Sequence, residues 1–281
     1  AQRPAAGAGH IERMDVLQEL HANLSISVGC HGSIRPITTN IWRDHLDTPR
    51  SHTHGSDCCD ISHLLAGIKQ FRQRCYEQNS DLMRRLVDLG QSPPALVISC
   101  SDSRVDPTLL SDADPGPGQL FVVRNVANLV PPYDPERYFD GADAAIEYAV
   151  CHLNVDHIIV LGHAHCGGIK AMLGAAGGQL LQSDFIGNWV SMALDARRLQ
   201  LSEKDAQGQP LLAPLERLKD NPALVERASV AGSLKNLMTY PWVRERVEAG
   251  NLVLHGWWFD LDTGDLWATE PGGTQLMPVI D

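Results

Sequence analysis

The clearest pattern in this chain is a set of short apolar runs that end abruptly in small polar residues. One run, Ala95–Ile98, follows Pro93-Pro94, and a second extends from His157 to Leu161. Short apolar runs bounded by turn residues are typical of buried strands. Further strands are predicted for residues 119–126, 251–260 and 266–269.

Segments with helical periodicity separate these strands. Apolar residues recur every three or four positions from Ile61 to Phe71, after a cap at Asp60 or Ser62. This helix continues through residues 81–87 and is predicted to stop at Gly90. Other helices are predicted for residues 141–153, from Cys166 onward, for 184–194 and for 214–240, the last broken at Pro241. Surface loops are predicted for residues 173–184 and 201–210.

The alternation of strands and helices predicts an α/β fold. Its main feature is a mostly parallel β-sheet flanked by helices, with an N-terminal helical arm. The turn Asp262–Asp265 predicts a C-terminal antiparallel hairpin. Residues 1–58 lack periodicity and are interpreted as an N-terminal extension, which leaves residues 59–281 as the folded domain.

Composition restricts the possible functions. The chain has 281 residues, 43% of them hydrophobic, and a formal net charge of −11. This charge argues against a nucleic-acid surface and against binding to anionic membranes. No apolar run reaches the roughly 18–20 residues that a membrane span requires. The start at Ala1, without Met or an apolar leader, indicates either a removed targeting segment or a fragment.

Cysteine usage indicates the compartment. The chain contains seven cysteines, an odd number, which favours a reducing compartment such as the cytoplasm over a disulfide framework. Cys75 and Cys151 lie in helical apolar patterns and are predicted to be core thiols. The histidines and cysteines of residues 51–59 are either a second metal site or part of a solvated leader, and the leader is favoured.

Reactive side chains follow the first and second apolar runs. Cys100, Asp102 and Arg104 come after the first, and His163 and Cys166 after the second. The carboxyl ends of parallel strands are where α/β proteins place their chemistry. Two thiolates and one imidazole bind Zn²⁺ tightly and leave the fourth tetrahedral position open. Cys166 also precedes a predicted helix, whose N-terminus favours a thiolate.

These motifs resemble those of the β-class carbonic anhydrases. Cys-x-Asp-x-Arg follows one strand, and about sixty residues later His-x-x-Cys-Gly-Gly follows another. The resemblance extends roughly from residue 61 to residue 266. It includes Phe121–Asn128, Ala145–Val150 and His255-Gly256-Trp257. Each half alone would be weak, but the two halves at strand ends, with this middle segment, are highly specific.

The resemblance implies a zinc lyase that interconverts CO₂ and bicarbonate. Zn²⁺ would be held by Cys100, His163 and Cys166, and zinc-bound hydroxide would attack CO₂ and give bicarbonate and a proton. Asp102, fixed by a bidentate pair with Arg104, would orient this hydroxide. The alternative is that Asp102 becomes a fourth zinc ligand in a closed form. A COS or CS₂ hydrolase of the same family, or a zinc-stabilised domain without turnover, are alternative functions.

The resemblance also implies a substrate cleft and an assembly. Phe121 and Tyr148 fall where the family lines its cleft, although core packing is an alternative for both. His165 is expected to face solvent. The family's minimal unit is a dimer, so a dimer or a larger even-numbered homo-oligomer is expected. In the family the N-terminal helix reaches a partner subunit, although packing on its own domain stays open.

Three positions depart from family members that carry an inhibitory bicarbonate pocket. Those members have Trp, Arg and Tyr where this chain has Val97, Arg124 and Phe259. An anion there would keep only Arg124 as a matching polar contact, so we predict non-cooperative inhibition by bicarbonate and an open site at neutral pH. Members with an always-open site commonly have Gln before a Pro-Gly turn, where this chain has Asp114 or Gly116.

Overall fold

The structure is a computed structural model that describes residues 62–78, 80–110, 117–137, 140–179, 183–197, 200–204 and 210–279. Two compact units divide the chain, Ala1–His63 and Leu64–Asp281, and the fold described here is that of the second. The predicted extension 1–58, the 51–59 segment and positions 114 and 116 lie outside the described residues.

A six-stranded mixed sheet organises the second unit, with strand order β2-β1-β3-β6-β7-β8. The first four strands in this order run parallel to one another, and the last two pairs are antiparallel. The strands are β1 (Ala95–Cys100), β2 (Leu120–Asn125), β3 (His157–His163), β6 (Val253–Phe259), β7 (Leu266–Thr269) and β8 (Leu276–Pro278). This sheet confirms the predicted fold class, although β8 was not predicted.

Helices connect the strands and precede the first of them. The arm consists of α2 (Ser62–Arg72), the π-helical η2 (Gln73–Gln78) and α3 (Ser80–Leu89). The others are α4 (Pro107–Leu110), η3 (Val126–Asn128), α5 (Gly141–Glu147), the π-helical η4 (Tyr148–His152), α6 (Gly167–Ala176), α7 (Ile186–Ser191), η5 (Met192–Arg197), α8 (Leu215–Asp220), α9 (Pro222–Leu237) and α10 (Pro241–Glu248). Among the described helices, none is long and apolar enough to cross a membrane.

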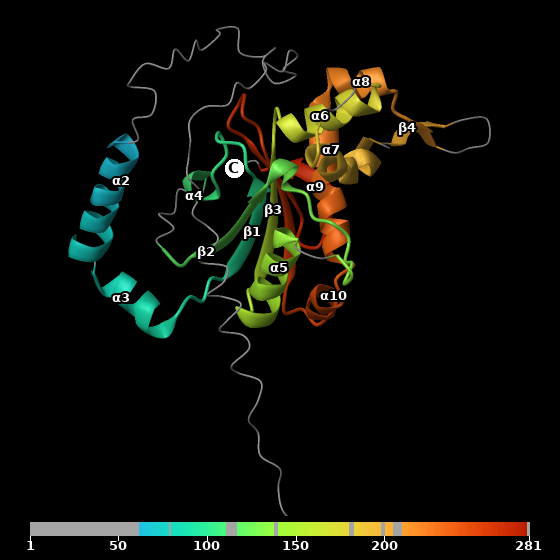
Figure 1. The fold of residues 1–281 in the computed structure, drawn as a ribbon. Helices are drawn as coiled ribbons and strands as arrows, with labels where there is room; N and C mark the ends of the chain where they lie inside the picture. Colours follow the sequence, from blue (N-terminus) through green and yellow to red (C-terminus); the bar gives the residue numbers. More distant parts are fainter. Residues whose placement is uncertain are drawn as a thin grey trace, which may run out of the picture. The chain divides into compact units, whose positions relative to one another are not determined.

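One face of the sheet carries the main core. Ile98 of β1 and Ile158 of β3 pack there against Ile146 of α5 and Leu234 of α9, and α5, α9 and α10 accompany the strands in Figure 1. All four of these side chains are essentially buried. The burial of alternate strand residues on this face fixes the register of the parallel strands. Their carboxyl ends therefore meet at one edge.

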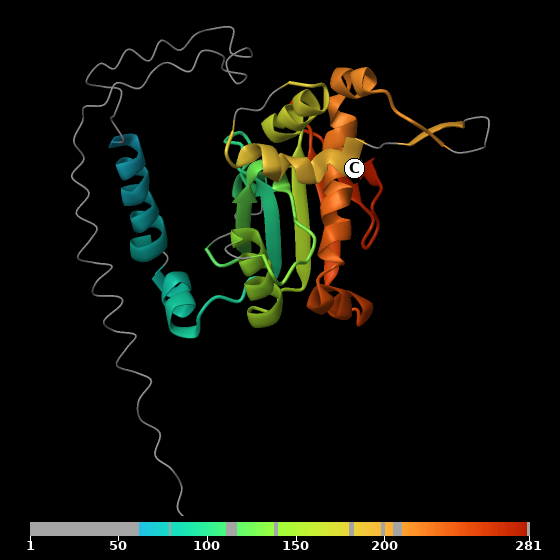
Figure 2. The ribbon, with the colours of Figure 1, turned by 45° about the vertical axis from the view of Figure 1, so that its right-hand side comes forward.

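A second apolar cluster lies beyond that edge. It contains Cys100 and Cys166 together with Ile169 and Met172 of α6 and Val190 of α7. Figure 2 shows α6 and α7, in yellow and gold, next to the ends of the strands. The two thiols are thus enclosed by side chains that exclude water.

Two predicted loops are wrong in part. Residues 173–184 were predicted to be a loop, but α6 continues to Ala176 because Ala171, Met172 and Leu173 are buried in the second cluster. Residues 201–210 were also predicted to be a loop, whereas β4 (Gln200–Lys204) pairs antiparallel with β5 (Pro210–Leu212). Burial of apolar side chains extends the helix in the first segment, and strand pairing orders the second. Both effects outweigh the polar composition from which a loop was predicted.

The predicted helix 214–240 is also corrected. It is divided at Asn221 into α8 and α9, with Pro222 in the first turn of α9. Pro241 does not only end a helix, as predicted, but also begins α10, for which Tyr240 is the N-cap residue. Proline is well suited to the first helical position because its missing N–H has no intrahelical acceptor there.

The two predicted core thiols differ from the prediction. Cys151 is exposed and Cys75 is only half-buried. Cys151 lies in η4, where the wider π-helical turn shifts the residues that follow away from the face expected for a regular α-helix. A sequence pattern read with a period of 3.6 residues cannot anticipate this shift.

Candidate metal centre

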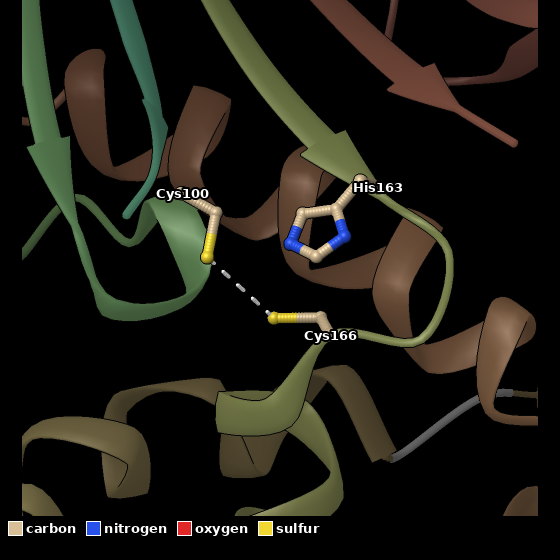
Figure 3. A group of neighbouring side chains, drawn as sticks. All are labelled: Cys100, His163 and Cys166. Carbon is tan, nitrogen blue, oxygen red and sulfur yellow. Dashed lines mark hydrogen bonds between the residues drawn. The ribbon is translucent and has the colours of Figure 1, made fainter. Parts of the chain in front are cut away.

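The three predicted ligands come together at the carboxyl edge of the sheet. Cys100 ends β1, His163 ends the neighbouring parallel strand β3, and Cys166 is the N-cap residue of α6. Their side chains point toward one another in Figure 3. One ligand atom from each lies within 4.8 Å of the others, and the two Sγ atoms are 4.0 Å apart. This spacing suits a single bound metal ion.

His163 presents a free nitrogen to this cluster. Its ring is completely buried, and Nδ1 lies 2.8 Å from the carbonyl oxygen of Ala164. Because a carbonyl only accepts hydrogen bonds, Nδ1 carries the proton and Nε2 carries the lone pair. Nε2 is buried and has no hydrogen-bond partner among the residues that the structure describes. A buried nitrogen lone pair without a partner fits a metal ion.

The two thiols share protons in the absence of a cation. A hydrogen bond from Cys166, with the further help of His163, lowers the pKa of Cys100 to about 4. The hydrogen bond to Cys100 and burial raise the pKa of Cys166 well above its usual value. The backbone N–H of Ala127 also donates to Sγ of Cys100 at 3.3 Å. Both thiols must be deprotonated to bind a metal ion, so binding would release protons, above all from Cys166.

Asp102 and Arg104 form a bidentate ion pair beside the ligands. Arg104 donates from Nε to Oδ1 at 2.9 Å and from its terminal nitrogen to Oδ2 at 2.7 Å. These hydrogen bonds lower the pKa of Asp102 to about 2. Oδ2 also lies 3.9 Å from Nε2 of His163. The carboxylate thus borders the ligand cluster while it is paired with Arg104.

Arg124 matches the Arg of the inhibitory bicarbonate pocket, but its guanidinium is already engaged in hydrogen bonds. Its guanidinium donates to the carbonyl oxygens of Cys100, Asp102 and Val105, at 3.1, 2.7 and 2.7 Å. It also lies 3.4 Å from a carboxylate oxygen of Asp106. Arg124 therefore binds the loop that carries Cys100 and Asp102.

Comparison with known proteins identifies the family. A sequence model described as carbonic anhydrase matches residues 95–266. A carbonic anhydrase of Synechococcus elongatus is 35% identical over 205 residues, which cover 72% of this chain and 69% of that protein. The β-carbonic anhydrase CcaA is similar in structure, with a TM-score of 0.62, 30% identity, and coverage of 79% and 92% of the two chains. The chain belongs to the β-class carbonic anhydrase family.

A second solved relative extends this likeness. One of two tetrameric β-carbonic anhydrases from Sordaria macrospora has a TM-score of 0.58 and 29% identity, and the match covers 78% of this chain and 98% of that one. The matched segment 95–266 contains both loops of the metal centre. The membership confirms the resemblance and the carbonic anhydrase assignment made from the sequence.

Phe121 and Tyr148 were predicted from the resemblance to line the carbonic anhydrase cleft. They lie next to each other but away from the candidate metal ligands of the same chain. The rings of Phe121 and Tyr148 are 5.9 Å apart, and 45% of Tyr148 is exposed. Phe121 pairs with Leu96, four residues before the pair Cys100–Asn125. Four residues of strand span about 13 Å. Neither ring is therefore at the metal centre of the same chain.

His165 faces solvent, as predicted. Its side chain is 54% exposed and lies 2.7 Å from a carboxylate oxygen of Asp262. Its backbone adopts a positive φ of 57°, and its carbonyl oxygen accepts a hydrogen bond from Arg104 at 3.1 Å. This hydrogen bond joins the two loops of the carbonic anhydrase site.

Sequence reasoning missed Glu226 of α9. Oε1 of this buried residue accepts the backbone N–H of Cys166 at 3.0 Å. The two residues are 60 positions apart, and Glu226 belongs to neither ligand motif. The only sequence signal was a carboxylate within a helical segment that otherwise supplies apolar residues to the core.

Proposed function

We propose that this chain catalyses the reversible hydration of CO₂ to bicarbonate and a proton, with Zn²⁺ held by Cys100, His163 and Cys166. The donor set supports zinc, because two thiolates and an imidazole are typical zinc ligands and leave a fourth position for substrate chemistry. When bound, Zn²⁺ supplies the Lewis acidity that ionises water near neutral pH. Two anionic ligands offset its charge, so activity is expected to rise above neutral pH.

The observation that carries the proposal is the hydrogen bonding of Asp102. A carboxylate has about four acceptor positions, and Arg104 occupies three of them through its backbone N–H and two side-chain donors. The remaining position is on Oδ2, the oxygen that lies 3.9 Å from Nε2 of His163. Asp102 is therefore suited to accept a hydrogen bond from the attacking water or hydroxide and to orient it.

The closed form is the alternative for Asp102. To become a fourth ligand, its carboxylate would have to leave Arg104 and forgo the charge-assisted hydrogen bonds of the bidentate pair. Those hydrogen bonds support an open site at neutral pH, and because they lower the pKa of the carboxylate to about 2, the pair with Arg104 persists well below neutral pH. Arg104 is thus assigned the role of holding Asp102 away from the metal.

We further propose that the protein works as a homo-oligomer, a dimer or a larger even number of copies. Leu65, Ile68 and Phe71 of α2 are 53%, 63% and 39% exposed, and contiguous exposed apolar groups indicate an interaction surface. The tetrameric relative from Sordaria macrospora supports this assembly. Phe121 and Tyr148, which lie away from their own metal centre, are suited to line the cleft of a neighbouring copy.

The proposed metal site also bears on the domain boundary and on the cellular compartment. We propose that residues 59–281 form the zinc domain and that it works in a reducing compartment, because both ligand thiols must remain unoxidised. The chemistry needs no large pocket, since CO₂ is small and apolar. COS and CS₂ have similar shapes and are the competing substrates of the alternative function.

Stopped-flow hydration assays test this function. The protein with Zn²⁺ should hydrate CO₂, lose that activity with a chelator and regain it when Zn²⁺ is restored. COS and CS₂ should be hydrolysed far more slowly than CO₂ is hydrated. Faster turnover of COS or CS₂ would identify the sulfur-compound hydrolase instead. Zinc-loaded, folded protein without turnover of any of the three would identify a zinc-stabilised domain.

A further inference from the structure

A buried carboxylate lies behind the metal centre without a role in the proposed reaction. Glu226 is only 2% exposed, and burial of a carboxylate is unfavourable unless hydrogen bonds compensate for its lost hydration. Oε1 has such a bond, from the backbone N–H of Cys166 at 3.0 Å. This is a contact from the second turn of α9 to the N-cap residue of α6.

The second oxygen of Glu226 belongs to a small group of buried polar atoms. Oε2, Nε1 of Trp258 and Nδ2 of Asn128 all lack hydrogen-bond partners in the described structure. Burial raises the pKa of Glu226, and the nearby indole N–H of Trp258 acts in the opposite direction. A Cβ at Gly162 would lie 3.5 Å from the Trp258 ring and 3.6 Å from Nδ2 of Asn128. These groups therefore gather beside the residue that precedes His163.

We propose that Glu226 is a positioning residue of the metal centre, which fixes the backbone of Cys166 so that its thiol points at Cys100 and His163. This inference rests on the proposed metal site. Cys166 has extended backbone angles, φ −66° and ψ 117°, and α6 begins directly after it. The direction of its Cα–Cβ bond is set by these angles. A carboxylate that holds the backbone N–H therefore also holds the direction of the thiol.

The alternative is that Glu226 only helps α9 to pack. An apolar residue of similar size would then serve as well, since α9 is surrounded by core side chains. Such a residue, however, would leave the N–H of Cys166 buried without an acceptor, which is unfavourable. Residues that support metal ligands from behind typically change metal affinity by about 10–100-fold when they are replaced.

Two substitutions at this position separate acceptance of a hydrogen bond from packing. Glu226→Gln keeps an oxygen that can accept the N–H of Cys166, whereas Glu226→Leu keeps only the approximate size. Ser229→Ala is the matched control, because Ser229 is equally buried one turn along α9 and its hydroxyl donates to the backbone oxygen of Glu226. Competition with a chromogenic chelator measures the dissociation constant for Zn²⁺ in the full-length variants.

We expect Glu226→Leu to weaken Zn²⁺ binding by about 10–100-fold. Glu226→Gln and Ser229→Ala should stay within about threefold of the unmodified chain, because both keep an acceptor for Cys166. An unchanged dissociation constant in Glu226→Leu would overturn the proposal. So would an equal loss in Glu226→Gln, because acceptance of the N–H would then not be the deciding contact.

A metal-free measurement keeps the test independent of the proposed function. Hydrogen exchange of the Cys166 amide in the zinc-free protein should be at least tenfold faster in Glu226→Leu than in Glu226→Gln, while the amides of α9 should exchange alike in both. Equal exchange at Cys166 would contradict the role of Glu226. If the unmodified chain binds no Zn²⁺, the proposed function fails, whereas the exchange result still decides whether Glu226 holds Cys166.

Discussion

The two loops that supply the proposed metal ligands are built in opposite ways. The β1 loop, residues 100–106, contributes one ligand and the Asp102–Arg104 pair, and Arg124 holds it by donating to its carbonyl oxygens. The β3 loop, residues 163–166, contributes two ligands and is held by an acceptor, Glu226, at a backbone N–H. The guanidinium of Arg124 fixes the first loop, and the carboxylate of Glu226 fixes the second.

The ligand positions differ in burial from the Asp102–Arg104 pair. Cys100, His163 and Cys166 are 4%, 0% and 2% exposed, whereas the side chains of Asp102 and Arg104 are 17% and 51% exposed. Tight metal binding benefits from ligands in a dry, rigid setting, while a group that must exchange protons with substrate and solvent needs access to water. The buried cluster drawn from both loops is therefore suited to retain a metal, whereas the more exposed pair of the β1 loop is suited to serve the reaction.

The largest effect is expected from the β3 loop. Cys166→Ala removes one of three protein ligands and should weaken Zn²⁺ binding by roughly 10³-fold, since a structural site of four ligands contributes about 10–16 kcal/mol in all. Activity and thermal stability should fall together. Elemental analysis and a melting curve measure both, with the exposed Cys151→Ser as the matched control. Zinc retained at full stoichiometry in Cys166→Ala would contradict this assignment.

The β1 loop should separate chemistry from metal binding. Asp102→Asn should lower kcat for CO₂ hydration by roughly 10²-fold, because an amide has only one acceptor oxygen, cannot keep the bidentate pair with Arg104 and no longer orients the attacking group. Its zinc content should remain that of the unmodified protein. Loss of the metal from Asp102→Asn, or hydration of CO₂ at the original rate, would contradict the assignment of Asp102 to the reaction and not to metal binding.

Protonation links the two loops. The pKa of Cys166 is raised by its hydrogen bond to Cys100 and by burial; burial opposes protonation of His163, but the Cys100 thiolate raises its pKa overall. Both residues must lose their protons before they bind a cation, so the Zn²⁺ association constant should increase with pH. We expect an increase of about tenfold or more per pH unit below neutrality. Isothermal titration in buffers of different ionisation enthalpy counts the released protons, and a value of zero would contradict this account.

The smallest effect concerns regulation by bicarbonate. Arg124 donates to three carbonyl oxygens of the β1 loop. The other two positions that correspond to the bicarbonate pocket are occupied by the apolar Val97 and Phe259. Bicarbonate should therefore inhibit only by competing at the metal, with a Hill coefficient of one. Initial rates over a range of bicarbonate concentrations measure this coefficient. A value clearly above one would show that a second anion site operates.

Sequence patterns anticipated the parallel strands and the ligands for a physical reason. Short apolar runs that end in Cys100 and His163 mark buried strands and their carboxyl ends without any tertiary information. The rest depends on contacts between distant segments. The engagement of Arg124 with three carbonyls and the contact of Glu226 with Cys166 have no local signal, because backbone atoms are the partners. The exposure of Cys151 likewise follows from a π-helical turn that the 3.6-residue period conceals.

The central claim is that one metal ion is bound by Cys100, His163 and Cys166. X-ray absorption spectroscopy of the zinc-loaded protein at neutral pH tests it most directly. The account predicts two sulfur atoms at about 2.3 Å and two nitrogen or oxygen atoms at about 2.0–2.1 Å from each zinc, one of the latter being His163. A shell with four sulfur atoms, or with none, would contradict it.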